Sequence, residues 1–213
     1  MAVPSSGQLS LTSIFAEVNE SDYYVNADNE IPSLTNLSTG GSPPGNAINT
    51  ANLSANRPDG STPHAMSEFY AYDHDFSPFS SVIADFTITA GTSATVYSSA
   101  LSFTLTMAAG TLTAAITDVA GADYGELDVS ISGDGDPGTS GTDNSATGFK
   151  GIGETASLLN PTGGAASGTI HVRFKFKGHG AGATDVNNCT FTANPTTADA
   201  STDVVAITKS TTR

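Results

Sequence analysis

The segment Ile170-His171-Val172-Arg173-Phe174-Lys175-Phe176 decides the fold class of this chain. Apolar residues occupy every second position of the segment, and basic or polar residues occupy the positions between them. Successive side chains of a β-strand point to opposite faces of the sheet. The pattern therefore predicts a strand with one buried face and one hydrated face.

Similar alternation recurs over much of the chain between residues 81 and 213. It is clear in residues 101–107 and 127–132, and weaker candidate strands lie near residues 83–89, 111–117, 189–193 and 203–208. Gly-rich turns separate these segments, and no long helical pattern lies between them. About seven half-buried strands of this kind predict a mainly β domain over residues 81–213, an antiparallel immunoglobulin-like β-sandwich.

Residues 1–80 have a different character. Leu11, Ile14, Phe15 and Val18 follow the i, i+3, i+4, i+7 spacing of an amphipathic helix, and Ser10 stands at the N-cap position. Residues 38–63 are rich in Gly, Pro, Ser and Asn, which predicts loops. Five aromatic residues then follow within a short segment: Phe69, Tyr70, Tyr72, Phe76 and Phe79.

A helix of two to three turns is too short to be stable in water by itself. We therefore expect residues 1–80 to bury their apolar side chains elsewhere, as a docking and assembly segment. Two interpretations stand side by side: the segment docks onto a neighbouring protein, or it wraps the sandwich of its own chain. The candidate docking residues are Leu11, Ile14, Phe15, Val18, Phe69, Tyr70 and Tyr72.

The charge balance argues against several classes of partner. The chain has 21 acidic and 7 basic residues and a formal net charge of −14. Such a chain repels nucleic-acid phosphates and anionic membrane surfaces, so we expect neither as a partner. The N-terminus has no signal-peptide pattern, and no window is long and apolar enough to span a membrane. We expect synthesis in the cytoplasm and a soluble product.

Evidence for catalysis is weak in the sequence. No G-x-S-x-G, H-E-x-x-H or P-loop motif is present, so we expect a protein that is not an enzyme and has no cofactor. The one candidate for a small ligand is the loop 133–138 (GDGDPG), where Asp134 and Asp136, with Asp143 nearby, could supply oxygen ligands to Ca²⁺. Asp and Gly also dominate ordinary turns, which is the alternative interpretation.

One basic cluster stands out in this acidic chain. It consists of Lys150, Arg173, Lys175 and Lys177, three of which lie on the polar side of the strand that decides the fold. Such a face could meet an acidic neighbour, or it could be an ordinary hydrated sheet face.

The segment Pro4-Ser5-Ser6-Gly7-Gln8-Leu9-Ser10-Leu11-Thr12-Ser13-Ile14 resembles the start of many virion structural proteins of tailed phages, notably marine phages. Their N-termini often read P-x-S-G-x-I-S-L-x-D-I, followed by I-S-L-S-E-Y-Y near a glycine-rich stretch. The second element is similar to residues 65–70 (AMSEFY) here. The chain departs from the pattern at Ser13, where an acidic residue is usual, and in a longer gap between the two elements.

This resemblance covers about a third of the chain and implies a virion protein with an N-terminal anchor and an outward-facing β module. It implies other virion proteins, and copies of the chain itself, as partners. The part could be a tail fibre, a collar, a baseplate-associated protein or a capsid decoration. The alternative is a carbohydrate-binding or receptor-binding adhesion module on the particle surface. Against that alternative, sugar sites usually need aromatic platforms, and the chain has no Trp.

Overall fold

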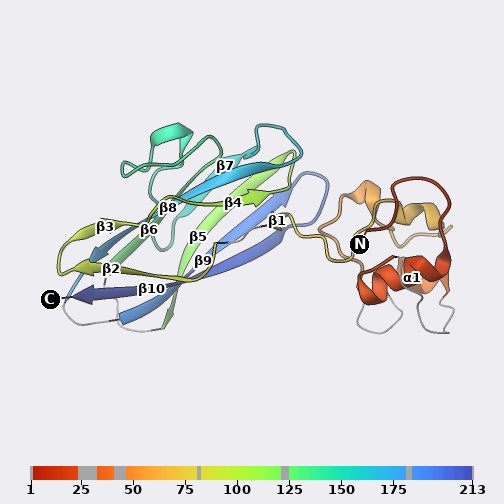
Figure 1. Cartoon of the computed structure of the whole chain (residues 1–213), viewed down its shortest axis with the longest axis horizontal. Helices are drawn as coiled ribbons and strands as arrows, with labels where there is room; N and C mark the ends of the chain where they lie inside the picture. The colour runs from red at the N-terminus through yellow and green to blue at the C-terminus, as the bar shows by residue number, and fades with distance from the viewer. Residues whose placement is uncertain are drawn as a thin grey trace. The chain divides into compact units, whose positions relative to one another are not determined.

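The computed structural model describes residues 2–23, 33–40, 47–80, 83–120, 125–180 and 184–212 (Figure 1). The chain forms two compact units. The smaller unit comprises residues 1–77 with residues 197–199, and the larger comprises residues 78–196 with residues 200–213. Each unit has its own hydrophobic core. No helix in the described part of the chain is long and apolar enough to cross a membrane.

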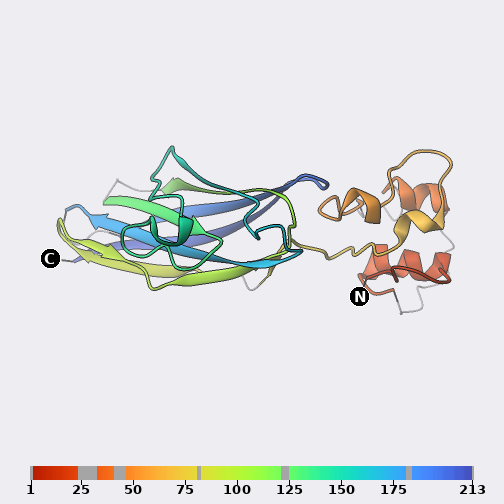
Figure 2. The same cartoon turned by 90° about the horizontal axis from the view of Figure 1, so that it is seen from above.

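The larger unit is a β-sandwich of two five-stranded sheets, seen as two layers in Figure 2. The first sheet contains β1 (Phe79–Ser80), β4 (Leu101–Leu105), β8 (Gly168–Gly178), β3 (Thr95–Tyr97) and β6 (Gly125–Ser132). The second sheet has the strand order β2 (Phe86–Gly91), β10 (Ser201–Thr212), β9 (Thr184–Pro195), β5 (Gly110–Ala120) and β7 (Thr155–Leu159). The prediction of a mainly β chain with an immunoglobulin-like sandwich and a short helical N-terminal region is confirmed.

Strand β8 organises the first sheet. It pairs with β4 and then with β3 along one edge, and with β6 along the other, always antiparallel. The second sheet is antiparallel except at one pair, because β2 runs parallel to β10. The predicted antiparallel sandwich therefore contains one parallel strand pair. Strand β2 continues into β3 of the opposite sheet and is not joined to β10 by a hairpin, so no tight turn dictates its direction.

The core of the sandwich follows the period-two pattern of the sequence. Ile170, Val172, Phe174 and Phe176 are all fully buried, as the alternation predicts. Their side chains belong to one cluster with apolar residues from both sheets. Cys189 lies in the same cluster, and burial raises the pKa of its thiol, so it is a structural residue here.

The smaller unit contains α1 (Leu11–Glu20), α2 (Leu34–Ser38) and the 3₁₀ turns η1 (Ser54–Asn56) and η2 (Met66–Phe69). Ser10 caps α1 as expected: its side chain accepts a hydrogen bond from the Ser13 N–H. The unit has a core of its own, made of Val3, Ile14, Phe15, Val18, Tyr23, Leu37, Phe69 and Tyr72. The expectation that this region cannot form a core alone is therefore wrong.

The physical reason is that several short elements share one apolar cluster. The stripe of α1 meets Leu37 of α2, Phe69 of η2 and Val3 of the N-terminal segment. Phe69 and Tyr72 pack edge to face, with ring centroids 5.8 Å apart. Tertiary contacts of this kind stabilise a helix whose own propensity is insufficient.

Hydrogen bonds from the Asn-rich stretch complete this unit. The Asn49 side chain donates to the carbonyls of His74 and Phe76, each at 2.8 Å, and its backbone N–H donates to the Tyr72 hydroxyl. The backbone N–H of His74 donates to the buried Glu17 carboxylate at 2.9 Å. Burial raises the pKa of Glu17, and it raises the pKa of Tyr72 to about 12.

Candidate functional site

The outer face of β3, β8 and β6 carries a cross-strand row of three side chains. Tyr97 lies opposite Lys175 in the register, and Lys175 lies opposite Asp128. Lys175 forms an ion pair with Asp128, and its ammonium nitrogen lies 5.2 Å from the ring centroid of Phe149. The ring centroids of Phe149 and Tyr97 are 5.8 Å apart. This face therefore holds two neighbouring aromatic rings beside a neutralised charge pair.

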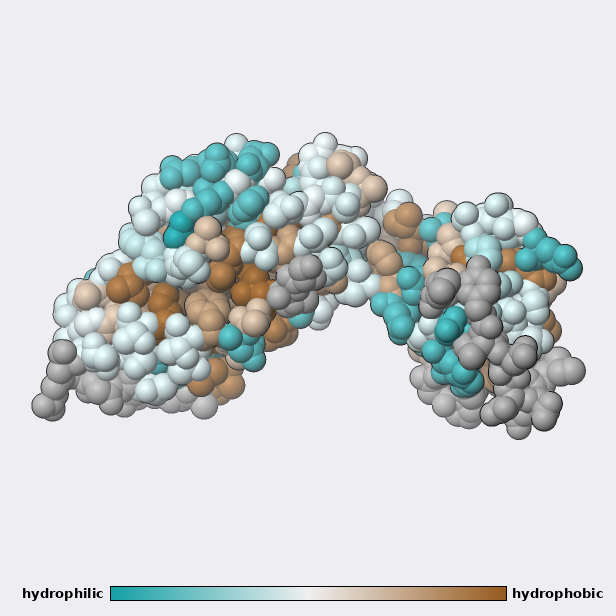
Figure 3. Space-filling model, in the orientation of Figure 1, coloured by the Kyte–Doolittle hydropathy of each residue, from teal (hydrophilic) through white to brown (hydrophobic). Residues whose placement is uncertain are grey.

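The loop after β6, residues 133–150, folds back over this strand. The hydroxyl of Ser130 donates to the carbonyl of Gly141 at 2.8 Å, and the hydroxyl of Ser132 donates to the carbonyl of Asn144. Both serines are buried although they lie on the polar side of their strand. Figure 3 shows the loop as a hydrophilic area on the surface of the sandwich. These hydrogen bonds hold the loop against the outer face of β6.

The end of the loop positions Phe149. Lys150 and Val129 exchange two backbone hydrogen bonds of 2.9 Å, which extend the edge of β6. Gly141 has φ of +73°, and a Cβ there would lie 2.4 Å from the Phe149 ring. Glycine is therefore required for this ring to pack against the loop backbone.

The carboxylates expected to bind Ca²⁺ do not form a cluster in the described part of the chain. The carboxylate of Asp136 receives two hydrogen bonds from the Arg173 guanidinium, and this pairing holds its pKa below the usual range. Asp143 accepts a hydrogen bond from the Ser140 hydroxyl at 2.9 Å. No group of three or more potential metal ligands that includes Asp134, or any other described residue, comes together. Arg173 therefore already neutralises the central carboxylate of the loop, and Ca²⁺ binding by these residues stays a prediction.

Two of the four residues of the basic cluster are paired with acidic residues. Arg173 and Lys175 both have acidic partners across the sheet or in the loop, while Lys177 is exposed at the end of β8. The face therefore does not offer a continuous positive surface to an acidic neighbour.

Sequence reasoning missed Tyr97 and Phe149. Tyr97 lies in a strand of three residues, which is too short to show an alternation. Phe149 lies in a stretch dominated by Gly, Ser and Thr, where a single aromatic residue could have been recognised as unusual. The pairing of Asp128 with Lys175 could have been anticipated only from the register of the two strands.

The candidate docking residues have a different place from the one expected. Ile14, Phe15, Val18, Phe69 and Tyr72 are buried in the core of the smaller unit, and Leu11 and Tyr70 are half-buried. They build the unit and do not form an exposed docking surface. Two other large apolar residues of this unit are exposed: Leu53 at 47% and Met66 at 39%.

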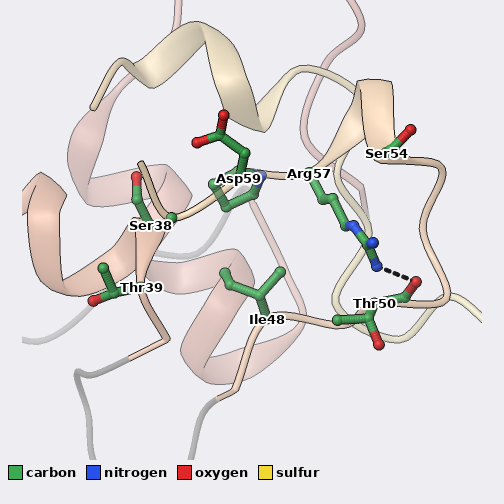
Figure 4. Close-up of a pocket in the computed structure, with 9 residues that line it drawn as sticks. Ser38, Thr39, Ile48, Thr50, Ser54, Arg57 and Asp59 are labelled. Atoms are coloured by element: carbon green, nitrogen blue, oxygen red, sulfur yellow. Dashed lines mark hydrogen bonds between the residues drawn. The ribbon is translucent and has the colours of Figure 1, made fainter. Parts of the chain in front are cut away.

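The smaller unit also contains an open pocket of about 550 Å³ (Figure 4). Arg57 donates to the carbonyl of Thr50 and forms an ion pair with Asp199 at 3.4 Å. Half of the other lining residues carry hydroxyl groups, and Ile48 and Asp59 also line the pocket. The guanidinium of Arg57 is already paired, so it is not available to bind an anionic ligand in this pocket.

Comparison with known proteins gives only weak similarities. No protein-family model matches the sequence, and no curated protein matches it. Among solved structures, the chain is similar to the seventh PapD-like domain of human CEP192, with 10% identity and a TM-score of 0.33 over 60% of this chain and 81% of that one. It is also similar to the collagen-binding subdomain of the Enterococcus faecalis surface protein ACE, with 11% identity and a TM-score of 0.32 over 64% and 98% of the two chains.

A third similar structure is CfaE, the adhesive subunit of the CFA/I fimbria of enterotoxigenic Escherichia coli. The identity is 10% and the TM-score 0.36, over 61% of this chain and 46% of that chain. At these identities and TM-scores, the similarities indicate no function for this chain.

Proposed function

We propose that this chain is a non-enzymatic structural component of a tailed-phage virion, attached through its N-terminal unit and presenting the β-sandwich. The observation that supports this most directly is the position of the phage-like motif. Residues 4–14 and 65–70, which carry the resemblance, belong to one folded unit with its own core, separate from the core of the sandwich. An anchor that folds independently can be shared among proteins whose outer modules differ.

Attachment requires surface residues, and the exposed apolar side chains of this unit are the natural candidates. Leu53 and Met66 lie at the start of η1 and η2. Partners in this proposal are other virion proteins, with further copies of the chain, and neither nucleic acid nor a membrane is involved.

Antibody-gold labelling of purified tailed-phage particles, with antibodies raised against the recombinant chain, tests the location. Gold at one defined position on the particle is expected. The same particles are also analysed by mass spectrometry. If no peptide of this chain is detected and the virions carry no gold label, the proposal is refuted.

The attachment step has its own test. The double variant Leu53→Glu/Met66→Glu should lose incorporation into particles, because two charges then replace apolar contact residues. The matched control, Thr12→Glu/Ser61→Glu, adds the same charge at exposed positions of the same unit and should assemble normally. Equal incorporation of the two variants would exclude Leu53 and Met66 as attachment residues.

A second candidate function is adhesion to a carbohydrate or protein receptor. Tyr97 and Phe149 favour it, because they place an exposed tyrosine ring against a half-buried phenylalanine ring on the outer face of the sandwich, next to a polar loop. A glycan array with the full chain and with Tyr97→Ala tests this candidate. Binding that Tyr97→Ala removes would support it, and binding that survives the substitution would place the receptor site elsewhere.

A further inference from the structure

One long stretch of this acidic chain has no charge at all. Residues 86–117 contain no Asp, Glu, Lys, Arg or His. The stretch forms β2, β3, β4 and most of β5. Strand β2 is an outer strand of the second sheet, and β3 and β4 lie along an outer side of the first sheet, where β1 covers only residues 104 and 105. Two sheet edges on one side of the sandwich are therefore uncharged.

A groove of about 320 Å³ is lined by these two edges. Its lining consists of residues 86–89 of β2, residues 96–99 at and after β3, and Leu101 of β4. Phe86, Val96 and Leu101 are only half-buried, although they pack against the sandwich core. In Figure 3, hydrophobic atoms reach the surface of the sandwich in the area where Figure 1 shows β2, β3 and β4.

The other sheet edges in the described part of the chain are protected. Strand β6 carries Glu126 and Asp128, and its edge is bonded to the backbone of Lys150. Strand β7 has five residues and lies between Glu154 and Pro161. Charge, proline and short length are the usual means by which proteins prevent edge-to-edge pairing. Within residues 86–101, neither a charge nor a proline is present.

We infer that this uncharged edge binds a second copy of the chain through pairing of β2 with β2 of the partner copy. The net charge of −14 makes two copies repel each other wherever acidic surfaces meet. At the uncharged edge, two copies can approach without a like-charge contact between the paired strands. The inference deepens the proposed structural role, since it names the surface by which copies associate, but its test needs no virion.

The pairing follows from symmetry. A twofold axis at the centre of β2 makes the two edge strands antiparallel and joins two five-stranded sheets into one sheet of ten strands. Thr87 and Thr89 are exposed, and with the axis at Ile88 the Thr87 of one copy would lie opposite Thr89 of the other. The two grooves would adjoin at the axis, so that the half-buried Phe86 side chains of both copies become covered.

Sedimentation velocity of the full chain over a concentration series tests the inference. The wild-type chain should form a dimer at micromolar concentration, and dimerisation should strengthen as salt rises, because salt screens the repulsion between two acidic copies. The variant Thr87→Lys/Thr89→Lys should weaken dimerisation at least tenfold, because it places four like charges along the paired edge.

The opposite edge of the same sheet supplies the control. Thr155→Lys/Ser157→Lys introduces the same two charges at exposed alternate positions of β7 and should dimerise as the wild type does. Circular dichroism and a thermal melt establish that both variants are folded. A chain that stays monomeric at high concentration and high salt overturns the inference, and so does a dimer that the β7 variant loses and the β2 variant retains. Both results leave the location of the protein in the virion as an independent question.

Discussion

The buried ion pair between Lys209 and Asp185 offers a quantitative test of how the sandwich is stabilised. These residues lie directly opposite each other on β10 and β9. Their side chains are 1% and 0% exposed, with 3.0 Å between the ammonium nitrogen and a carboxylate oxygen. Lys209 also donates to the carbonyl of Gly125 at 3.1 Å. The ammonium group is therefore held by two acceptors inside the protein.

Lys209→Met keeps most of the side-chain volume and removes the charge. Asp185 is then left as a buried carboxylate without its cationic partner, which typically costs about 3–5 kcal/mol. For a domain of this size, about 4 °C of melting temperature corresponds to each kcal/mol, so the melt of the sandwich should fall by about 12–20 °C. Lys209→Met/Asp185→Val removes both charges and should recover most of the loss. About 1 kcal/mol stays lost, because the Gly125 carbonyl no longer has its donor.

Differential scanning calorimetry of the full chain measures both variants, and hydrogen exchange assigns each transition to a unit. If the unpaired buried carboxylate causes the loss, Lys209→Met is much less stable than Lys209→Met/Asp185→Val. If the two lose the same stability, the desolvated charge is not the cause. A single variant that costs less than about 1 kcal/mol would show that water reaches the pair.

Further outcomes follow from the same contacts. Phe174→Ala should destabilise the sandwich by about 3–5 kcal/mol in chemical denaturation, whereas Lys175→Ala should cost less than about 1 kcal/mol; equal losses would mean that the faces of β8 are assigned wrongly. Burial raises the pKa of Glu17 in the folded state, so the smaller unit should lose stability as pH rises from the ordinary Glu value through the raised one, and Glu17→Gln should abolish this slope in hydrogen-exchange measurements. The pairing with Arg173 lowers the pKa of Asp136, so the sandwich should lose stability as pH falls from the ordinary Asp value through the lowered one, an acid loss that melts of Asp136→Asn should no longer show.

The sandwich could be predicted from the sequence because its signal is local. The alternation from Ile170 to Phe176 states which side chains are buried before any partner strand is known. The parallel pairing of β2 with β10 could not be predicted, since it depends on a crossing between sheets that no local pattern records. Lys209 illustrates the same limit: it continues the buried alternation of Val205 and Ile207, and only the register places Asp185 opposite it.

The smaller unit shows where reasoning from local propensity fails. The short helix at Leu11 is correctly predicted, and so is its apolar stripe. The stability of this helix is not a property of the helix itself, because the cluster also includes Leu37 and Phe69 from distant parts of the sequence. The polar stretch around Asn49 contains turn residues, which favour a loop. The side-chain amide of Asn49 nevertheless donates to two backbone carbonyls, and its backbone N–H donates to a tyrosine hydroxyl. Side-chain hydrogen bonds of this kind leave no periodic signal in a sequence.

Charged residues are distributed differently on the face formed by β6 and β8 and at the edge formed by β2, β3 and β4. On β6 and β8, Lys175 is paired with Asp128 and Arg173 with Asp136, so these charges hold a loop and a strand register in place. On β2, β3 and β4, charge is absent, and with it the usual barrier to pairing between edges. A monomeric protein under selection for solubility would gain from one lysine in residues 86–101. The absence of any such residue beside an apolar groove is therefore better explained by an edge that is covered in the assembled state than by a hydrated one.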